Sequence, residues 1–146
     1  MMPLTNSAAQ PAPGRKVSTR PGSVCAETNV LVVDDDRSFR QLARSLLEPS
    51  GVRIAEAETG FNGLAYLKAH AQEVDAVIMD LILPDRDGIS AIREVKSAFP
   101  GVKVIAVSGA DSADLYLRVS AFLGADAVLP KSRIERLSSL LGEVLR

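Results

Sequence analysis

Five short apolar runs alternate with stretches of helical periodicity, and this alternation limits the fold more than any other feature of the sequence. The runs cover residues 30–33, 52–57, 76–79, 102–107 and 127–129. Strands that are apolar on both faces are typical of a parallel sheet covered by helices on both sides. With right-handed crossovers, the pattern predicts an α/β fold, a doubly wound five-stranded parallel sheet of order 2-1-3-4-5 with five helices.

Each apolar run leads into a segment whose apolar residues recur every three or four positions. The first segment ends near Gly51 and carries Phe39, Leu42, Ala43, Leu46 and Leu47. The second begins after Thr59 and carries Phe61, Leu64, Ala65 and Leu67. We expect the third helix after Gly88, the fourth over residues 112–123, and the fifth around Leu137 to Val144.

The first 27 residues lie outside this alternation. They hold four of the eight prolines and no aromatic residue. Residues 10–14, with two prolines and a glycine, cannot continue a helix or a central strand. We therefore interpret residues 1–27 as a disordered, Pro-rich N-terminal extension and residues 28–146 as one domain.

The composition excludes several classes of protein. A single Cys rules out an intramolecular disulfide and a cysteine metal cluster, and a single His rules out a His-rich metal site. The chain has no apolar stretch of the roughly 18 residues that a membrane span needs. A formal net charge of −1 does not favour nucleic acid as a partner. We expect a cytoplasmic domain without membrane contact.

Polar residues stand where the apolar runs end. Asp34–Asp36 follow the first run, Asp80 the third, Ser108 the fourth, and Lys131 comes shortly after the fifth. In an open parallel sheet, the carboxyl ends of the strands share one edge, and ligands bind where the strand order reverses. The sequence therefore predicts that carboxylates, a hydroxyl and an ammonium group meet at one site.

Carboxylates gathered in this way need a counter-charge. Two of them about 5 Å apart repel by roughly 3 kcal/mol at an effective dielectric constant near 20. Mg²⁺ is commonly held by one or two carboxylates together with water. Asp80 could act as a nucleophile on phosphorus, with Ser108 as donor and Lys131 as point charge. Asp36 is the expected N-cap of the first helix. The cluster indicates a Mg²⁺-dependent phosphoryl-transfer site.

On these motifs, residues 28–146 resemble the receiver domain of two-component response regulators. The resemblance rests on four motifs in order: residues 32–36, 77–88, 107–109 and 129–131. It implies a flavodoxin-like fold and a phosphoryl group accepted by Asp80 from the phosphohistidine of a sensor histidine kinase or a histidine phosphotransfer protein. It implies no enzymatic activity beyond this self-directed phosphotransfer and autodephosphorylation.

The resemblance also implies roles for the other residues of the site. Asp35 and Asp80 would bind Mg²⁺ through their side chains, Ile82 through its backbone carbonyl, and Asp34 through water. Ser108 would turn toward the phosphoryl group, and Lys131 would pair with it.

The chain departs from the receiver pattern in two residues. Ser132 stands where such domains usually carry Pro, and with Glu135 it predicts a capping box at the start of the last helix. Val128 stands where an aromatic residue is common. No output segment follows the last helix, so we expect a stand-alone receiver without direct DNA binding. Its downstream protein target would bind the face formed by the fourth helix, fifth strand and fifth helix.

Two alternatives remain open at this stage. One is a receiver-like interaction module that no longer switches by phosphorylation. The other is an aspartate-nucleophile phosphatase, since Asp34, Asp36 and Ser38 satisfy the Asp-x-Asp-x-Ser/Thr pattern of haloacid-dehalogenase-like hydrolases. The second alternative leaves Asp80 without a role.

Overall fold

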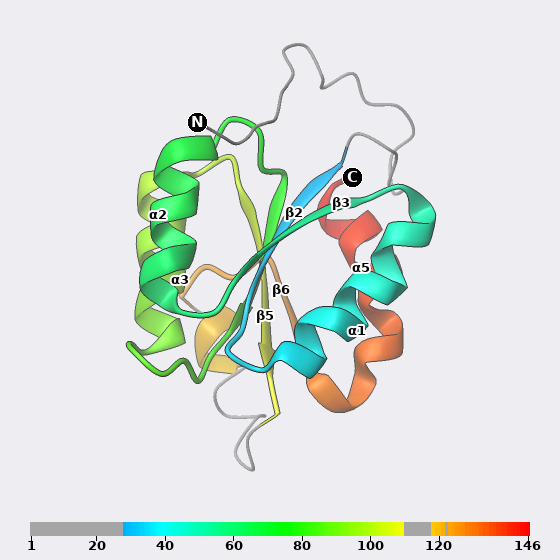
Figure 1. The fold of residues 1–146 in the computed structure, drawn as a ribbon. Helices are drawn as coiled ribbons and strands as arrows, with labels where there is room; N and C mark the ends of the chain where they lie inside the picture. Colours follow the sequence, from blue (N-terminus) through cyan, green and yellow to red (C-terminus); the bar gives the residue numbers. More distant parts are fainter. Residues whose placement is uncertain (1–27, 110–117, 122) are drawn as a thin grey trace.

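The computed structural model describes residues 28–109, 118–121 and 123–146, which form a five-stranded parallel sheet with helices on both faces (Figure 1). The sheet order is β3-β2-β4-β5-β6, and every neighbouring pair is parallel. This confirms the predicted order 2-1-3-4-5. The strands are β2 (Asn29–Val33), β3 (Arg53–Ala57), β4 (Ala76–Asp80), β5 (Lys103–Ser108) and β6 (Ala127–Pro130).

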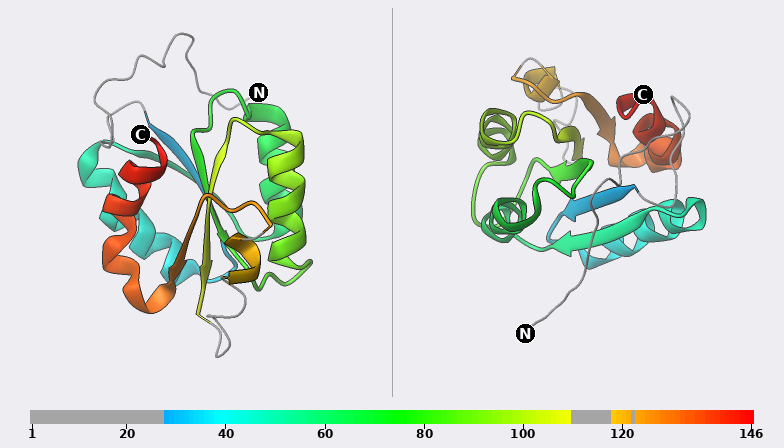
Figure 2. Two further views of the ribbon diagram at one scale, coloured as in Figure 1. Left: turned by 180° about the vertical axis from the view of Figure 1, so that it is seen from behind. Right: turned by 90° about the horizontal axis from the view of Figure 1, so that it is seen from above.

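The helices cover the two faces of the sheet in pairs (Figure 2). One pair is α1 (Arg37–Leu47) with α5 (Leu137–Val144), and the other is α2 (Gly60–His70) with α3 (Gly88–Ala98). There are also two short 3-10 segments. η1 (Glu48–Ser50) lies between α1 and β3, and η2 (Lys131–Arg136) lies between β6 and α5. Of the predicted helix at 112–123, the structure describes residues 118–121, which are helical, and residue 123, which lies in a turn.

Side chains of each central strand point alternately into two apolar clusters. Leu31 and Val77 pack toward α2 and α3, whereas Val30 and Ile78 pack toward α1 and α5. Every residue of β4 is buried. The continuous apolar runs are therefore explained by burial on both faces.

Side-chain caps start three of the helices. The Asp36 carboxylate accepts the Ser38 N–H at 2.9 Å and caps α1, as predicted. The Thr59 hydroxyl and the Asp87 carboxylate cap α2 and α3 in the same way. After η1 the chain turns at Gly51, whose φ of 89° favours glycine.

Two apolar residues expected on buried helix faces are instead exposed. Leu42 is 42% exposed and Phe61 72% exposed. The buried face of α2 is formed by Gly60, Gly63, Leu64 and Leu67. Gly63 brings the backbone of α2 close to Val33 of β2, where an added Cβ would lie 2.8 Å from a Val33 methyl carbon, and Phe61 lies on the outer side. The prediction for α2 was wrong because the helical periodicity was read from large apolar residues alone, and glycines were not considered for the buried face.

The predicted capping box at Ser132 is also wrong. Lys131–Arg136 forms the 3-10 segment η2, and neither η2 nor α5 has a side-chain cap. The Glu135 carboxylate pairs with the Arg133 guanidinium, with Nε and Oε2 3.3 Å apart, rather than reaching back along the chain. The short connection from Lys131 into α5 sets a tighter backbone than a capped α-helix has.

The predicted extension, residues 1–27, lies outside the described residues. Among the described helices, none has the length and apolar character required to cross a membrane.

Gly88 lets α3 begin directly against the end of β4. A Cβ atom there would lie 2.4 Å from the Asp80 carbonyl oxygen and 2.5 Å from Leu81 Cα. Both are backbone atoms, so relief requires movement of the strand end. We expect Gly88→Ala to lower the free energy of unfolding by about 3 kcal/mol, measured by urea denaturation followed by circular dichroism. Gly101→Ala is the control, because a Cβ there meets nothing within 4 Å; equal losses for both variants would contradict this explanation.

Candidate functional site

The carboxyl ends of β2 and β4 bring three carboxylates together. One oxygen each from Asp34, Asp35 and Asp80 lies within 4.8 Å of the others. Asp34 is fully buried and Asp80 is 5% exposed, whereas Asp35 is exposed. β2 and β4 are neighbours at the point where the strand order reverses. The predicted convergence of these residues is therefore confirmed in its geometry.

Lys131 reaches the same cluster from the end of β6, the edge strand on the far side of β5. It follows Pro130, the last residue of β6, which pairs with Ser108 of β5. Its Nζ lies 2.7 Å from Asp34 Oδ2 and 3.5 Å from Asp80 Oδ2. The ammonium group also lies 4.5 Å from the centroid of the Phe39 ring on α1. A cation above an aromatic face is attracted by the ring, so Phe39 helps to hold the lysine over the carboxylates.

The electrostatics of the site follow from burial and crowding. Burial, and then the neighbouring Asp34 carboxylate, raise the pKa of Asp80 to about 6 against the opposing effect of Lys131. Burial alone would lower the pKa of Lys131, but the Asp34 and Asp80 carboxylates outweigh it and raise that pKa. Lys131 therefore stays charged at neutral pH.

Ser108 and Ile82 border the cluster. Ser108 ends β5 and is buried, one position beyond Val107, the register partner of Asp80. The Ile82 N–H donates to Asp80 Oδ1 at 3.3 Å. The phosphoryl contact of Ser108 and the metal contact of the Ile82 carbonyl stay predictions.

The loop after Asp80 is tied to α2. Asp85 Oδ1 accepts the Gly60 N–H at 2.9 Å and Oδ2 accepts the Phe61 N–H at 2.7 Å. A carboxylate at a helix N-terminus satisfies free N–H groups and the helix dipole. Asp85 thus links the β4–α3 loop to α2, a role that the sequence analysis missed because the partners are distant in the chain.

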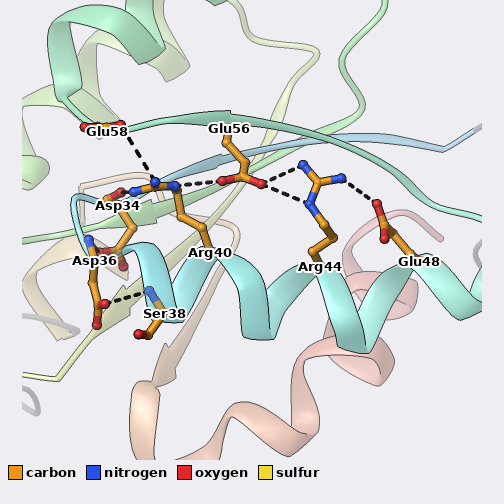
Figure 3. Close-up of polar contacts among 8 residues, drawn as sticks. All are labelled: Asp34, Asp36, Ser38, Arg40, Arg44, Glu48, Glu56 and Glu58. Atoms are coloured by element: carbon orange, nitrogen blue, oxygen red, sulfur yellow. Dashed lines mark hydrogen bonds and ion pairs between the residues drawn. The ribbon is translucent and has the colours of Figure 1, made fainter.

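An arginine on α1 also reaches the site. Arg40 is buried and contacts both the backbone of Asp34 and the carboxylate of Glu56 on β3 (Figure 3). Arg40 was not among the residues predicted for the site. One signal was available: Arg40, Ala43 and Leu47 share the spacing of the buried face of α1.

The residues present fit a hard divalent cation such as Mg²⁺. The buried Asp34 Oδ2 pairs with the Lys131 ammonium at 2.7 Å, and this single cation offsets only part of the charge of the three carboxylates. Asp34, Asp35 and Asp80 together form an oxygen-only donor set, which is the kind that Mg²⁺ prefers.

Comparison with known proteins agrees with the fold. The family model described as the response regulator receiver domain matches residues 30–141. The KDP operon transcriptional regulatory protein KdpE of Escherichia coli strain K12 is 41% identical over 105 residues, covering 71% of this chain and 44% of KdpE. The sensor kinase CckA of Brucella abortus is 34% identical over 80 residues, covering 55% of this chain and 8% of CckA. The chain thus spans less than half the length of these relatives.

Solved structures show the same architecture. A CheY-like receiver domain protein from Methanospirillum hungatei JF-1 has a TM-score of 0.66 and 28% identity, covering 80% of this chain and 95% of its own. The BeF3-activated DrrB receiver domain has a TM-score of 0.70 and 26% identity, covering 81% of this chain and 97% of its own.

The raised pKa of Asp80 predicts a pH dependence of stability. Because the pKa rises from 3.8 to about 6 on folding, the folded protein binds more protons between these values, and its free energy of unfolding falls as the pH rises through this window. In EDTA at pH 7.5 we expect Asp80→Asn to be more stable than wild type by about 1–3 kcal/mol. Urea denaturation across pH 4–8 measures both effects. A variant that kept the wild-type pH dependence would contradict this assignment.

Proposed function

The chain belongs to the response regulator receiver domain family, and from this premise we propose that Asp80 accepts a phosphoryl group from the phosphohistidine of a histidine kinase or histidine phosphotransfer protein. The observation that carries the proposal is the position of the Lys131 ammonium, 2.7 Å from Asp34 and 3.5 Å from Asp80. A cation at this place can bind an anion that arrives at the Asp80 carboxylate.

Asp80 is the better nucleophile of the two buried carboxylates. Asp34 is fully buried, its Oδ1 accepts the Asp36 N–H at 2.9 Å, and its Oδ2 contacts Lys131. Asp80 retains some exposure, and its hydrogen bond from Ile82 is long at 3.3 Å. This difference favours a receiver over a phosphatase with Asp34 as nucleophile.

The transfer needs little covalent chemistry from the protein. An oxygen of the ionised Asp80 carboxylate forms a bond to phosphorus, the P–N bond of the phosphohistidine breaks, and the imidazole nitrogen keeps the bonding electron pair. Lys131 binds a phosphoryl oxygen, and Ser108 donates a hydrogen bond to another. Asp35, Asp80 and the Ile82 carbonyl, with Asp34 acting through water, would hold Mg²⁺, which would neutralise charge at the phosphoryl oxygens. We propose no catalytic activity toward other substrates.

The position of Lys131 also suggests how phosphorylation of Asp80 changes the conformation of a surface outside the site. Lys131 begins η2, which continues directly into α5. When its ammonium moves toward a phosphoryl oxygen, the β6–η2–α5 connection shifts with it. Val128 is partly buried against the core, so its aliphatic side chain transmits the shift by packing. We propose that the receiver acts as a signalling unit through protein contact, without DNA contacts of its own. The contact surface would be the face formed by the predicted fourth helix, β6 and α5.

Mass spectrometry tests the phosphoacceptor. Acetyl phosphate with Mg²⁺ is expected to add one phosphoryl group to wild type and none to Asp80→Asn, because the asparagine amide is not a nucleophile at neutral pH. Tandem spectra after borohydride reduction identify the modified residue. Asp80→Asn is the discriminating variant, because a phosphatase with its nucleophile at Asp34 would keep its labelling when Asp80 is replaced. Wild type without any adduct, under acetyl phosphate or beryllofluoride, would leave only the non-switching interaction module.

NMR tests the output face. Beryllofluoride with Mg²⁺ is expected to shift the amide resonances of η2 and the first turn of α5 in wild type. Ser108→Ala removes one donor to the phosphoryl mimic, so we expect the adduct to form with smaller shifts in these segments. Shifts confined to the three acidic residues would contradict the proposed path through Lys131.

A further inference from the structure

Arg40 is a buried cation outside the set of residues assigned above. It lies on α1 with 6% exposure, between the end of β2 and β3 (Figure 3). Its Nη1 donates to the Asp34 carbonyl oxygen at 2.8 Å, and its Nε donates to Glu56 Oε1 at 2.8 Å. Its Nη2 lies 3.8 Å from Glu58 Oε2. One guanidinium thus joins the acidic loop, residues 34–36, to β3, the edge strand next to β2.

The contact with Asp34 completes the restraint of that residue. The Asp34 N–H donates to the Ala57 carbonyl at 3.0 Å, and Asp34 Oδ1 accepts the Asp36 N–H at 2.9 Å. The carbonyl held by Arg40 belongs to the peptide unit between Asp34 and Asp35. Because a peptide is planar, this hydrogen bond also sets the backbone from which the exposed Asp35 side chain departs.

Glu56, the carboxylate that binds Arg40, is held in place by a second arginine. Glu56 accepts from Arg40 Nε and from Arg44, one turn later on α1, at 2.6 Å. Hydrogen bonds from Arg40 and then Arg44 lower the pKa of Glu56, so this carboxylate remains charged. A planar guanidinium can donate to a carboxylate and a carbonyl at the same time, which a lysine ammonium on a flexible chain does less well.

We propose that Arg40 is a positioning residue that sets the affinity of the site for Mg²⁺. By fixing the Asp34–Asp35 peptide, it holds both carboxylates in the orientation that converges with Asp80. Residues that orient metal ligands typically change metal affinity by 10- to 100-fold when replaced. The inference rests on the proposed function in requiring a Mg²⁺ site, but it concerns binding of the metal and not phosphoryl transfer.

Isothermal titration of the unphosphorylated full chain with MgCl2 tests the proposal. We expect Arg40→Lys to raise the Mg²⁺ dissociation constant about 10-fold. At saturating Mg²⁺, labelling by acetyl phosphate should reach the wild-type extent, because Asp80, Ser108 and Lys131 are unchanged. This separation of metal affinity from maximal labelling would not arise from a general loss of folded protein.

Arg44→Lys is the matched control. Arg44 lies on the same helix and binds the same Glu56 carboxylate, with a second contact to Glu48. Among the described residues, the hydrogen bonds of its side chain go to these two carboxylates and not to residues 34–36. We expect its Mg²⁺ dissociation constant to stay within about twofold of wild type, because the hydrogen bond to the Asp34 carbonyl comes from Arg40 and is left in place.

Folding is checked first by urea denaturation in EDTA. If Arg40→Lys is unfolded, Arg40→Met replaces it, because its flexible apolar side chain can fill the space without a buried charge and cannot donate to the Asp34 carbonyl. A folded Arg40 variant that binds Mg²⁺ as tightly as wild type overturns the proposal. Equal weakening by Arg44→Lys also overturns it, because the effect would then belong to the charge network around Glu56. Failure of the proposed function looks different: wild type itself would show no labelling.

Discussion

One ammonium group facing two buried carboxylates is the interaction on which the rest of this structure depends. Lys131 lies within 3.5 Å of Asp80 and closer still to Asp34, at an edge where both carboxylates are almost removed from solvent. Burying ionised groups is costly unless they are paired. A single cation offsets only part of that cost, and burial, followed by the Asp34 charge, raises the pKa of Asp80. The carboxylates can therefore bind a further cation. The Lys131 ammonium can bind an anion that reaches Asp80.

The parallel sheet is what brings these groups together. The residues are separated by long stretches of chain, yet each follows the carboxyl end of a strand, and parallel register places those ends along one edge. The loops beyond the strands are then fastened individually. Asp85 ties the β4–α3 loop to α2, and Arg40 ties the β2–α1 loop to β3. Such fastening limits the movement of the ligands before any metal or phosphoryl group arrives.

Sequence reasoning succeeded where the signal was local or periodic. The strands, their order and the cap at Asp36 could be predicted because burial on both faces and capping leave patterns within a few residues. It failed at Phe61, since glycines and not large residues form the buried face of α2. It failed at Ser132 because the connection from Lys131 imposes a 3-10 backbone on a sequence with good capping residues.

The sequence by itself determined which strand ends carry charge, and hence that carboxylates and a lysine share one edge of the sheet. Only the tertiary structure decided that Lys131 lies closer to Asp34 than to Asp80, that Phe39 supports its ammonium group, and that a buried arginine holds the acidic loop. The physical reason is that the strands are located by hydrophobic burial, which periodicity records residue by residue, and right-handed crossovers then limit their order. Charge pairing depends on distances of a few ångströms between side chains from different elements, and no spacing along the chain encodes those distances.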